Sequence, residues 1–191
     1  VPKPRWPRLE NNYIKLGFGN FMTPLAKIYL HGGRNARIDW GAEYHHLSTA
    51  VGHTDYARFG DHTLVAKGSY NFGYTILYTK VRVDYKKYYE YGAYRSDSMF
   101  KEISKDTWKD SLARNYYRVE ATLGVKKTYE PQFFYFDIPL QLRFFGDKMQ
   151  NREMYAALMP TARLRITDSL FAAGDGTFAM GVVKSMGFKN G

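Results

Sequence analysis

Residues 115–145 constrain the fold more than any other part of the sequence, because apolar and polar side chains alternate through them almost without a break. Apolar residues occupy every second position of 117–125 and again of 134–144, with mostly polar or charged residues between them. Successive side chains of a strand point to opposite faces, so this period of two predicts two strands, each with one apolar and one charged face. The polar segment 127–131, which ends in proline, predicts the turn that joins them. Each strand is about eleven residues long, the length of a tilted strand that crosses a bilayer, roughly 9–11 residues.

The rest of the chain repeats this pattern. Further strands are expected at 12–20, 23–31, 36–48, 63–70, 74–85 and 154–166, followed by a segment at 170–186 that is either one bulged strand or a small hairpin. The segment 98–112 could form a short helix. Short connections at 32–35, 71–73, 127–131 and 167–169 alternate with connections at 21–24, 49–62, 86–114 and 145–153, which include the two longest. Because this alternation is typical of outer-membrane barrels, the sequence predicts an all-β, antiparallel up-and-down transmembrane β-barrel of about 8–10 strands, or part of a larger barrel.

The amino-acid composition supports this prediction and excludes other classes of protein. Aromatic residues make up 17% of the chain, which favours strands over helices. The sequence contains no apolar run long enough for a transmembrane helix, and without cysteine it has neither a disulfide framework nor thiolate chemistry. Prolines at positions 2, 4 and 7 predict that 1–11 is a leader or linker and that 12–191 forms the barrel domain.

The charged residues of the predicted strands fall on the face opposite the apolar positions. In a membrane barrel this face lines the lumen, where opposite charges can pair across strands. The predicted lumen-lining, solute-facing residues are Lys15, Lys27, Arg37, Asp39, Glu43, Lys80, Arg82, Asp84, Arg118, Glu120, Asp137, Arg143, Arg163 and Arg165. The predicted lipid-facing residues are Val119, Leu123, Phe136 and Leu140. Two interfacial girdles are predicted from Tyr44, Tyr70, Tyr74, Tyr85, Tyr117, Phe134, Phe144 and Tyr155.

The segments 13–20 and 23–29, with 44–48 and the tyrosines at 85, 88 and 89 before a long loop, resemble barrel strands of Gram-negative outer-membrane proteins of the TonB-dependent-receptor-like group. The resemblance implies a location in the outer membrane, contact with outer-membrane lipid including lipopolysaccharide, and other outer-membrane or periplasmic subunits as possible partners. The sequence shows no plug domain and no energy-coupling segment, so active transport by this chain alone is not expected. About nine predicted segments, against the even strand numbers of such barrels, favour a piece of a larger barrel or a tenth strand.

The net charge of +10 predicts an anionic partner. Nucleic acid is not expected, because the strand cations are spread along one face and partly matched by carboxylates. Cations outside the strands are predicted to contact lipopolysaccharide phosphates or anionic solutes: Arg58, Lys101, Lys105 and Lys109.

One candidate nucleophile set lies within 45–48. On a strand His46 and Ser48 share one face while His45 takes the other, so an orienting carboxylate would have to come from elsewhere. A metal site from His53, Asp55, Asp61 and His62 lacks compact ligand spacing. We therefore expect no enzyme activity, cofactor or metal, and predict a non-enzymatic outer-membrane pore, receptor-like protein or scaffold subunit. The alternatives are a barrel enzyme that acts on lipid and a soluble β-barrel that binds an anionic ligand.

Overall fold

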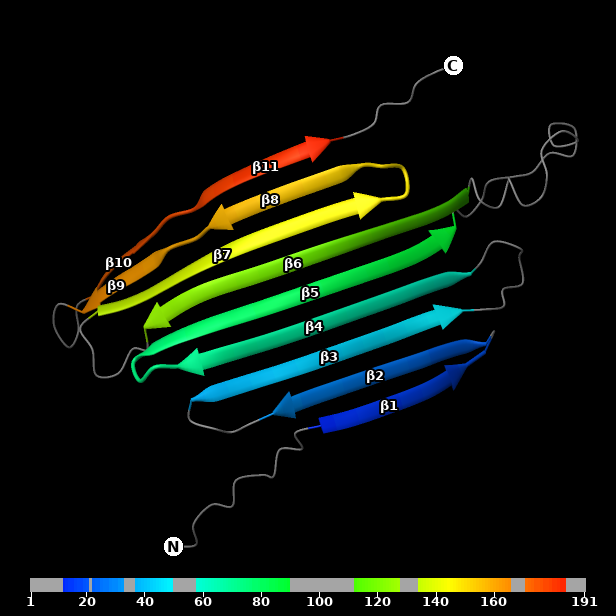
Figure 1. Cartoon of the computed structure of the whole chain (residues 1–191), viewed down its shortest axis with the longest axis horizontal. Coiled ribbons are helices and arrows are strands. Elements are labelled where there is room, and N and C mark those ends of the chain that lie inside the picture. The colour runs from blue at the N-terminus through cyan, green and yellow to red at the C-terminus, as the bar shows by residue number, and fades with distance from the viewer. Residues whose placement is uncertain are drawn as a thin grey trace, which may run out of the picture.

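The computed structural model describes residues 12–20, 22–32, 37–49, 58–89, 112–127, 134–165 and 171–184, and nearly all of them lie in one antiparallel sheet (Figure 1). The first eight strands pair with one another in chain order, so the predicted all-β, up-and-down arrangement is confirmed. The strands are β1 (Asn12–Gly19), β2 (Thr23–Gly32), β3 (Ile38–Thr49), β4 (Phe59–Asn71), β5 (Thr75–Tyr89), β6 (Ala113–Lys127), β7 (Phe134–Asp147), β8 (Arg152–Leu158), β9 (Thr161–Arg165), β10 (Phe171–Asp175) and β11 (Phe178–Lys184).

The last four strands form two rows of the sheet. β8 and β9 pair with β7 in one continuous register, and Pro160, which has no backbone N–H to donate, lies in the break between them. β10 and β11 continue that register along β9 and β8, and the Gly176 N–H donates to the Pro160 carbonyl at 3.0 Å across the break. The eleven strands of the described residues therefore form nine rows. The segment predicted at 170–186 is one interrupted strand, and its interpretation as a hairpin is wrong.

Two strands are longer than the sequence pattern predicts. β4 begins at Phe59 where position 63 is expected, and β5 continues to Tyr89 where position 85 is expected. The polar residues in these extensions pair across strands, as in the ion pair of 2.9 Å between Lys86 Nζ and Asp61 Oδ2. The helix predicted at 98–112 lies outside the described residues except for Leu112, and the leader at 1–11 lies wholly outside them.

Connections of different length gather at the two ends of the sheet. One end carries 20–22, 50–58, 90–112 and 148–151, and the other carries 33–37, 72–74, 128–133 and 166–170 (Figure 1). In the turn 72–74, Gly73 adopts a φ of 87°, which favours glycine, and the Phe72 N–H donates to the Thr75 carbonyl at 2.7 Å. At the other end, Asp147 accepts from the backbone N–H of Asn151 at 2.9 Å and from its side-chain amide at 2.7 Å.

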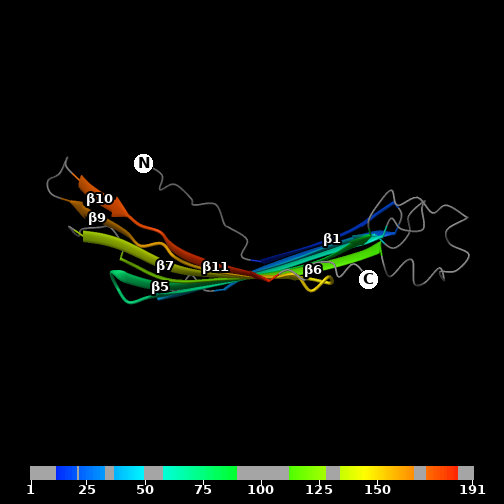
Figure 2. The same cartoon turned by 90° about the horizontal axis from the view of Figure 1, so that it is seen from above.

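The sheet is a single curved and twisted layer that does not close on itself (Figure 2). β1 forms one edge, and β10 with β11 forms the other. The only buried apolar side chains among the described residues are Leu112, Ala113 and Ala157, so the described part of the chain has no hydrophobic core of its own. The predicted closure into a barrel is therefore not present in this sheet. None of the described residues belongs to a helix with the length and apolar character needed to cross a membrane.

Candidate functional site

The sheet has one polar and one apolar face, and the strand register assigns each residue to one of them. Residues directly opposite on neighbouring strands point to the same side. On one side Asp84 stands opposite Thr63 and Arg118, while on the other side Val83 stands opposite Leu64 and Val119. We call the first side the polar face and the second the apolar face. Both are open to the surroundings, and many large apolar side chains are exposed, among them Leu123 at 52% and Leu142 at 47%.

Two aromatic bands border the apolar face. At the end with the longer connections, His46, His62, Tyr85 and Tyr117 follow one another on adjacent strands. At the other end lie the exposed rings of Tyr70, Phe72 and Phe134. Among the described residues between these bands, no Asp, Glu, Lys or Arg lies on the apolar face.

The spacing of the two bands fits a bilayer. Phe72, whose ring lies 4.4 Å from that of Tyr70, and His62 are separated by about ten residues, or about 33 Å at roughly 3.3 Å per residue of strand. A strand tilted by about 40° would then cover about 25 Å across the membrane, the height of the apolar band in outer-membrane barrels. The apolar face therefore has the height, the charge-free centre and the aromatic borders of a lipid-facing surface.

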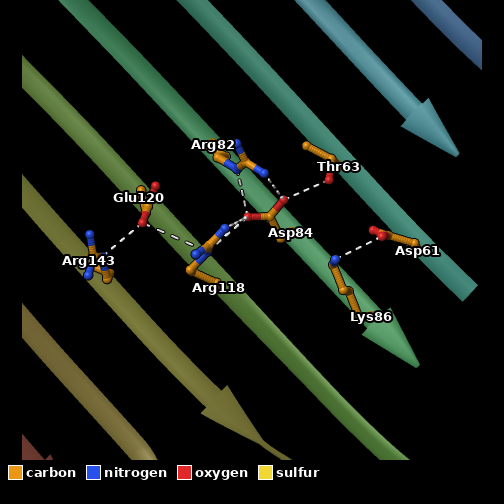
Figure 3. A network of polar contacts seen from close by, with 8 residues as sticks. All are labelled: Asp61, Thr63, Arg82, Asp84, Lys86, Arg118, Glu120 and Arg143. Atoms are coloured by element: carbon orange, nitrogen blue, oxygen red, sulfur yellow. Dashed lines mark hydrogen bonds and ion pairs between the residues drawn. The ribbon is translucent and has the colours of Figure 1, made fainter. Parts of the chain in front are cut away.

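The centre of the polar face is an ion network around Asp84, whose side chain is 1% exposed (Figure 3). Arg82 donates from Nε to Oδ2 at 2.8 Å and from Nη2 to Oδ1 at 3.0 Å, while Arg118 donates from Nε and Nη2 to Oδ2 at 3.0 and 2.7 Å. The Thr63 hydroxyl donates to Oδ1 at 2.7 Å. Two guanidinium groups and a hydroxyl thus compensate the desolvation of one buried carboxylate.

The network extends to both sides of Asp84. Glu120 lies 2.9 Å from Arg143 Nε and 3.9 Å from Arg118 Nε, so carboxylates and guanidinium groups alternate from β5 across β6 to β7 (Figure 3). Because the charges pair with one another across three strands, they hold the register of the sheet as well as making its surface polar.

A second cross-strand contact on the polar face spans a whole strand. The Tyr78 hydroxyl on β5 donates to Asp137 Oδ1 on β7 at 2.7 Å, although β6 lies between them. The intervening residue is Gly124, and a Cβ there would overlap the Tyr78 ring. The absence of a side chain at Gly124 therefore allows Tyr78 to lie across β6.

Toward β1 the polar face carries four lysines that outnumber the two carboxylates beside them, Asp39 and Glu43 on β3. Lys67 stands directly opposite Lys80, and Lys15 directly opposite Lys27. Within the described part of the chain, none of these four ammonium groups takes part in an ion pair or a hydrogen bond. Like charges directly opposite are unfavourable in a sheet, so this part of the face is suited to contact with an anion.

The structure places the predicted solute-facing residues on the polar face, apart from Arg37, which lies just before β3. It brings Arg82, Asp84, Arg118, Glu120 and Arg143 together, and it leaves Lys15, Arg163 and Arg165 far from that network along the sheet. The predicted lipid-facing residues Val119, Leu123, Phe136 and Leu140 all lie on the apolar face.

Sequence reasoning missed the contributions of Thr63, Asp61, Lys67, Tyr78 and Lys86. Alternation with apolar neighbours is a signal that could have found Thr63, Lys67 and Tyr78, whereas Asp61 and Lys86 lie among polar residues that carry no such signal.

A polar quartet of Tyr44, His46, Ser48 and His62 lies on the apolar face, at the band near the longer connections. Ser48 Oγ is 3.0 Å from His46 Nε2, and His46 Nδ1 is 3.1 Å from His62 Nδ1. Tyr44 Oη is also 3.1 Å from His62 Nδ1. His46 and Ser48 thus share one face, while His45 stands opposite Thr63 and Lys27 on the polar face.

Within the described ranges, no three or more His, Cys, Asp or Glu residues lie close enough to hold a metal ion. Of the metal set suggested by the sequence, His53 and Asp55 lie outside these ranges, while Asp61 and His62 are neighbours on β4 that point to opposite faces.

No protein-family model, curated protein or solved structure matches this chain.

Proposed function

We propose that the sheet is part of the wall of an outer-membrane β-barrel of the TonB-dependent-receptor-like kind. The apolar face contacts lipid, including lipopolysaccharide, and the polar face lines the interior. The observation that carries this proposal is the uncovered apolar face, whose centre is free of charge among the described residues and which has aromatic borders at both ends. An exposed apolar surface of this size is unusual for a soluble monomer and is typical of a surface that contacts a membrane or a partner.

The wall needs further strands to close. Neighbouring rows are antiparallel, so the first and the ninth row, β1 and β10–β11, run in the same direction (Figure 1). Joining these two edges directly would give a parallel pair, whereas bacterial single-chain barrels close with an even number of antiparallel strands. An odd number of additional strands satisfies this rule. A barrel of only about nine rows would also be filled by its own side chains, so conduction requires the larger ring.

The polar face then determines what the barrel accepts. Its ion network on β5–β7 is compensated internally, whereas the lysines toward β1 form no ion pairs among the described residues and exceed the two nearby carboxylates, Asp39 and Glu43. Charges that line a pore set its preference for ions of the opposite sign. We infer a pore or receptor-like wall with a preference for anionic solutes, or a scaffold subunit with the same surfaces.

Detergent requirement and electrophoretic mobility test the wall assignment. We expect the purified chain to need detergent and to show no mobility shift on boiling, because the open sheet lacks the strands that close the ring. A mobility shift on boiling would show a closed barrel and would contradict the need for additional strands. A freely soluble monomer would overturn the membrane assignment.

Cysteine accessibility tests the direction of the two faces. The chain has no cysteine, so single replacements at adjacent residues of β7 form a matched pair. In membranes we expect Leu142→Cys, on the apolar face, to be protected from a water-soluble maleimide. Gln141→Cys, on the polar face, should react. Equal reaction of both would contradict the assignment of the apolar face to lipid.

A further inference from the structure

The polar quartet on the apolar face has the connectivity of a hydrolytic triad. A nucleophile needs a base within hydrogen-bond distance and a third group that orients the base. Ser48 Oγ lies 3.0 Å from one ring nitrogen of His46, and the other ring nitrogen lies 3.1 Å from His62 Nδ1. The orienting group that the sequence did not identify is thus a histidine on the neighbouring strand, directly opposite His46.

One assignment of protons serves catalysis. In it the Ser48 hydroxyl donates to Nε2 of His46, and Nδ1–H of His46 donates to Nδ1 of His62. Nδ1 of His62 has a single lone pair, so the Tyr44 hydroxyl, 3.1 Å from it, competes with His46 for the same acceptor. When His46 accepts a second proton at Nε2, its Nδ1–H still points at His62, which orients the ring without supplying the negative charge of a triad carboxylate.

We propose that Ser48, His46 and His62 hydrolyse a carboxylic ester of membrane lipid, an activity in addition to the proposed pore or scaffold role of the wall. Ser48 is the nucleophile, His46 the general base and acid, and His62 a positioning residue that acts through His46. The site lies on the apolar face at the border between the charge-free centre and the strand ends. The ester groups of a lipid lie at the corresponding depth, between acyl chains and headgroups.

The surroundings of Ser48 leave room for an ester. Gly60 stands directly opposite Ser48 on β4, and the nearest atom to a Cβ at Gly60 would be His62 Nε2 at 3.9 Å. The nucleophile therefore has an open space beside it on the same face. Toward the middle of β4 the apolar face continues with Leu64, which is 46% exposed and lies opposite Tyr44. An acyl chain can lie along this surface while its carbonyl carbon reaches Ser48.

The reaction needs only water as a co-reactant. The Ser48 hydroxyl proton passes to Nε2 of His46 while Oγ bonds to the ester carbonyl carbon. The bond to the alcohol oxygen then breaks, and that oxygen takes the proton from Nε2. Water attacks the acyl-Ser48 ester in the same manner, its proton passes through His46 to Ser48 Oγ, and the carboxylic acid leaves.

Covalent labelling tests the nucleophile. We expect a fluorophosphonate to add once to the full chain in detergent, with the label mapped by mass spectrometry to Ser48. The reaction in detergent does not depend on membrane insertion, so its outcome is independent of the wall assignment, and labelling of the wild-type chain needs no variant to fold. An absence of labelling at Ser48 overturns the proposal.

Substitutions of these residues and of matched controls distinguish a catalytic role from a structural one. With a soluble nitrophenyl ester we expect Ser48→Ala to abolish turnover and His46→Gln to lower it by about 10²–10⁴-fold. Two controls should leave it unchanged: His45→Gln, adjacent to His46 but on the polar face, and Ser69→Ala, a serine of the polar face on β4. Unchanged turnover in Ser48→Ala would overturn the proposal.

The effect of His62 substitutions on kcat and KM tests its positioning role separately. We expect His62→Leu to lower kcat by about 10²-fold with KM unchanged, and His62→Asp, which restores an acceptor for His46 Nδ1–H, to recover most of kcat. Equal loss in both variants would mean that His62 acts only through folding and would remove it from the triad.

Vesicles test the substrate. Reconstituted into phosphatidylcholine vesicles, the protein should release fatty acid, and Ser48→Ala should not. Hydrolysis of the nitrophenyl ester without release of fatty acid would overturn the assignment to membrane lipid.

Discussion

On the polar face of the sheet, charged groups are numerous and many are paired, whereas the central part of the apolar face carries no charge among the described residues. Adjacent residues of the same strand show the contrast. Asp84 is held by two arginines and a threonine, while Val83 and Tyr85 on either side of it face the other way among apolar and aromatic residues. The difference shows that the two sides of this single layer are suited to two different environments, one polar and one apolar.

The same contrast explains how a single layer without a core can have a definite register. A slip of one residue would exchange the faces and would place Arg82, Asp84 and Arg118 on the apolar side. The slip would cost free energy on the polar face through lost ion pairs, and under the proposed wall assignment it would also place charges on the apolar side, in lipid. Register is thus specified twice, once on each side.

The largest expected effect comes from moving a charge to the wrong face. Leu140→Arg places a guanidinium in the charge-free centre of the apolar face and should lower the free energy of unfolding in membranes by about 2–4 kcal/mol. Gln141→Arg, one residue further along β7 and on the polar face, is the matched control and should change it by less than about 0.5 kcal/mol. Urea titration in vesicles measures both. Equal effects would remove the distinction between the faces, and Val119→Arg should repeat the Leu140 result on β6.

The next effect comes from breaking the ion network. Asp84→Ala leaves Arg82 and Arg118 facing each other without the carboxylate that separates them. Because both arginine side chains are more than a third exposed, solvent screens much of this repulsion, and we expect a loss of about 2 kcal/mol rather than the larger value of a fully buried pair.

The double variant Asp84→Ala with Arg82→Ala sharpens this test. Removing one of the two opposed cations should recover part of the loss, and a double-mutant cycle in the same titration measures the coupling. Additive effects of the two changes would mean that the network contributes nothing to stability.

The faces of this sheet were predictable from the sequence because a period of two assigns each strand residue to one side without knowledge of its partners. That is why Asp84, Arg118 and Glu120 were placed together on one face before any register was known. The ends of β4 and β5 were not predictable, because Asp61 and Lys86 have the composition of a loop. They lie in strands because each finds its partner on the neighbouring strand, which is information that a single segment does not contain.

Specific side-chain contacts were even harder to predict from the sequence. The sequence identified His46 and Ser48 as a pair on one face, but it assigned His62 to a loop and so missed the group opposite His46. Whether the sheet closes could not be predicted from the local pattern either. Alternation determines to which side each residue of a strand points, but it does not determine how many strands complete the ring. The sequence left nine and ten strands open, and nine rows were established only when β8 with β9, and β10 with β11, proved to share a register.

A smaller effect is expected from filling the space that lets Tyr78 cross β6. Gly124→Ala puts a methyl group where the Tyr78 ring lies, so the ring must move and its hydrogen bond to Asp137 is lost. We expect a loss of about 1–2 kcal/mol from overpacking. In the double variant with Tyr78→Ala the added methyl should cost much less. Thermal unfolding in detergent measures both, and an equal loss with and without the ring would show that Tyr78 does not depend on Gly124.

The smallest expected effect concerns the part of the polar face where charge is unmatched. Lys80→Glu replaces one of two directly opposite lysines and should raise the free energy of unfolding by about 0.2–1 kcal/mol, because Lys67 gains a cross-strand partner. Arg82→Glu, two residues away on the same strand, should destabilise instead, since it opposes Asp84. Opposite signs for the same charge change on one strand would show that the polar face contains a compensated structural network and, beside it, positive charge kept free at a cost in stability. If both changes destabilise, the lysine pairs are already satisfied, and the preference for anions loses its physical basis.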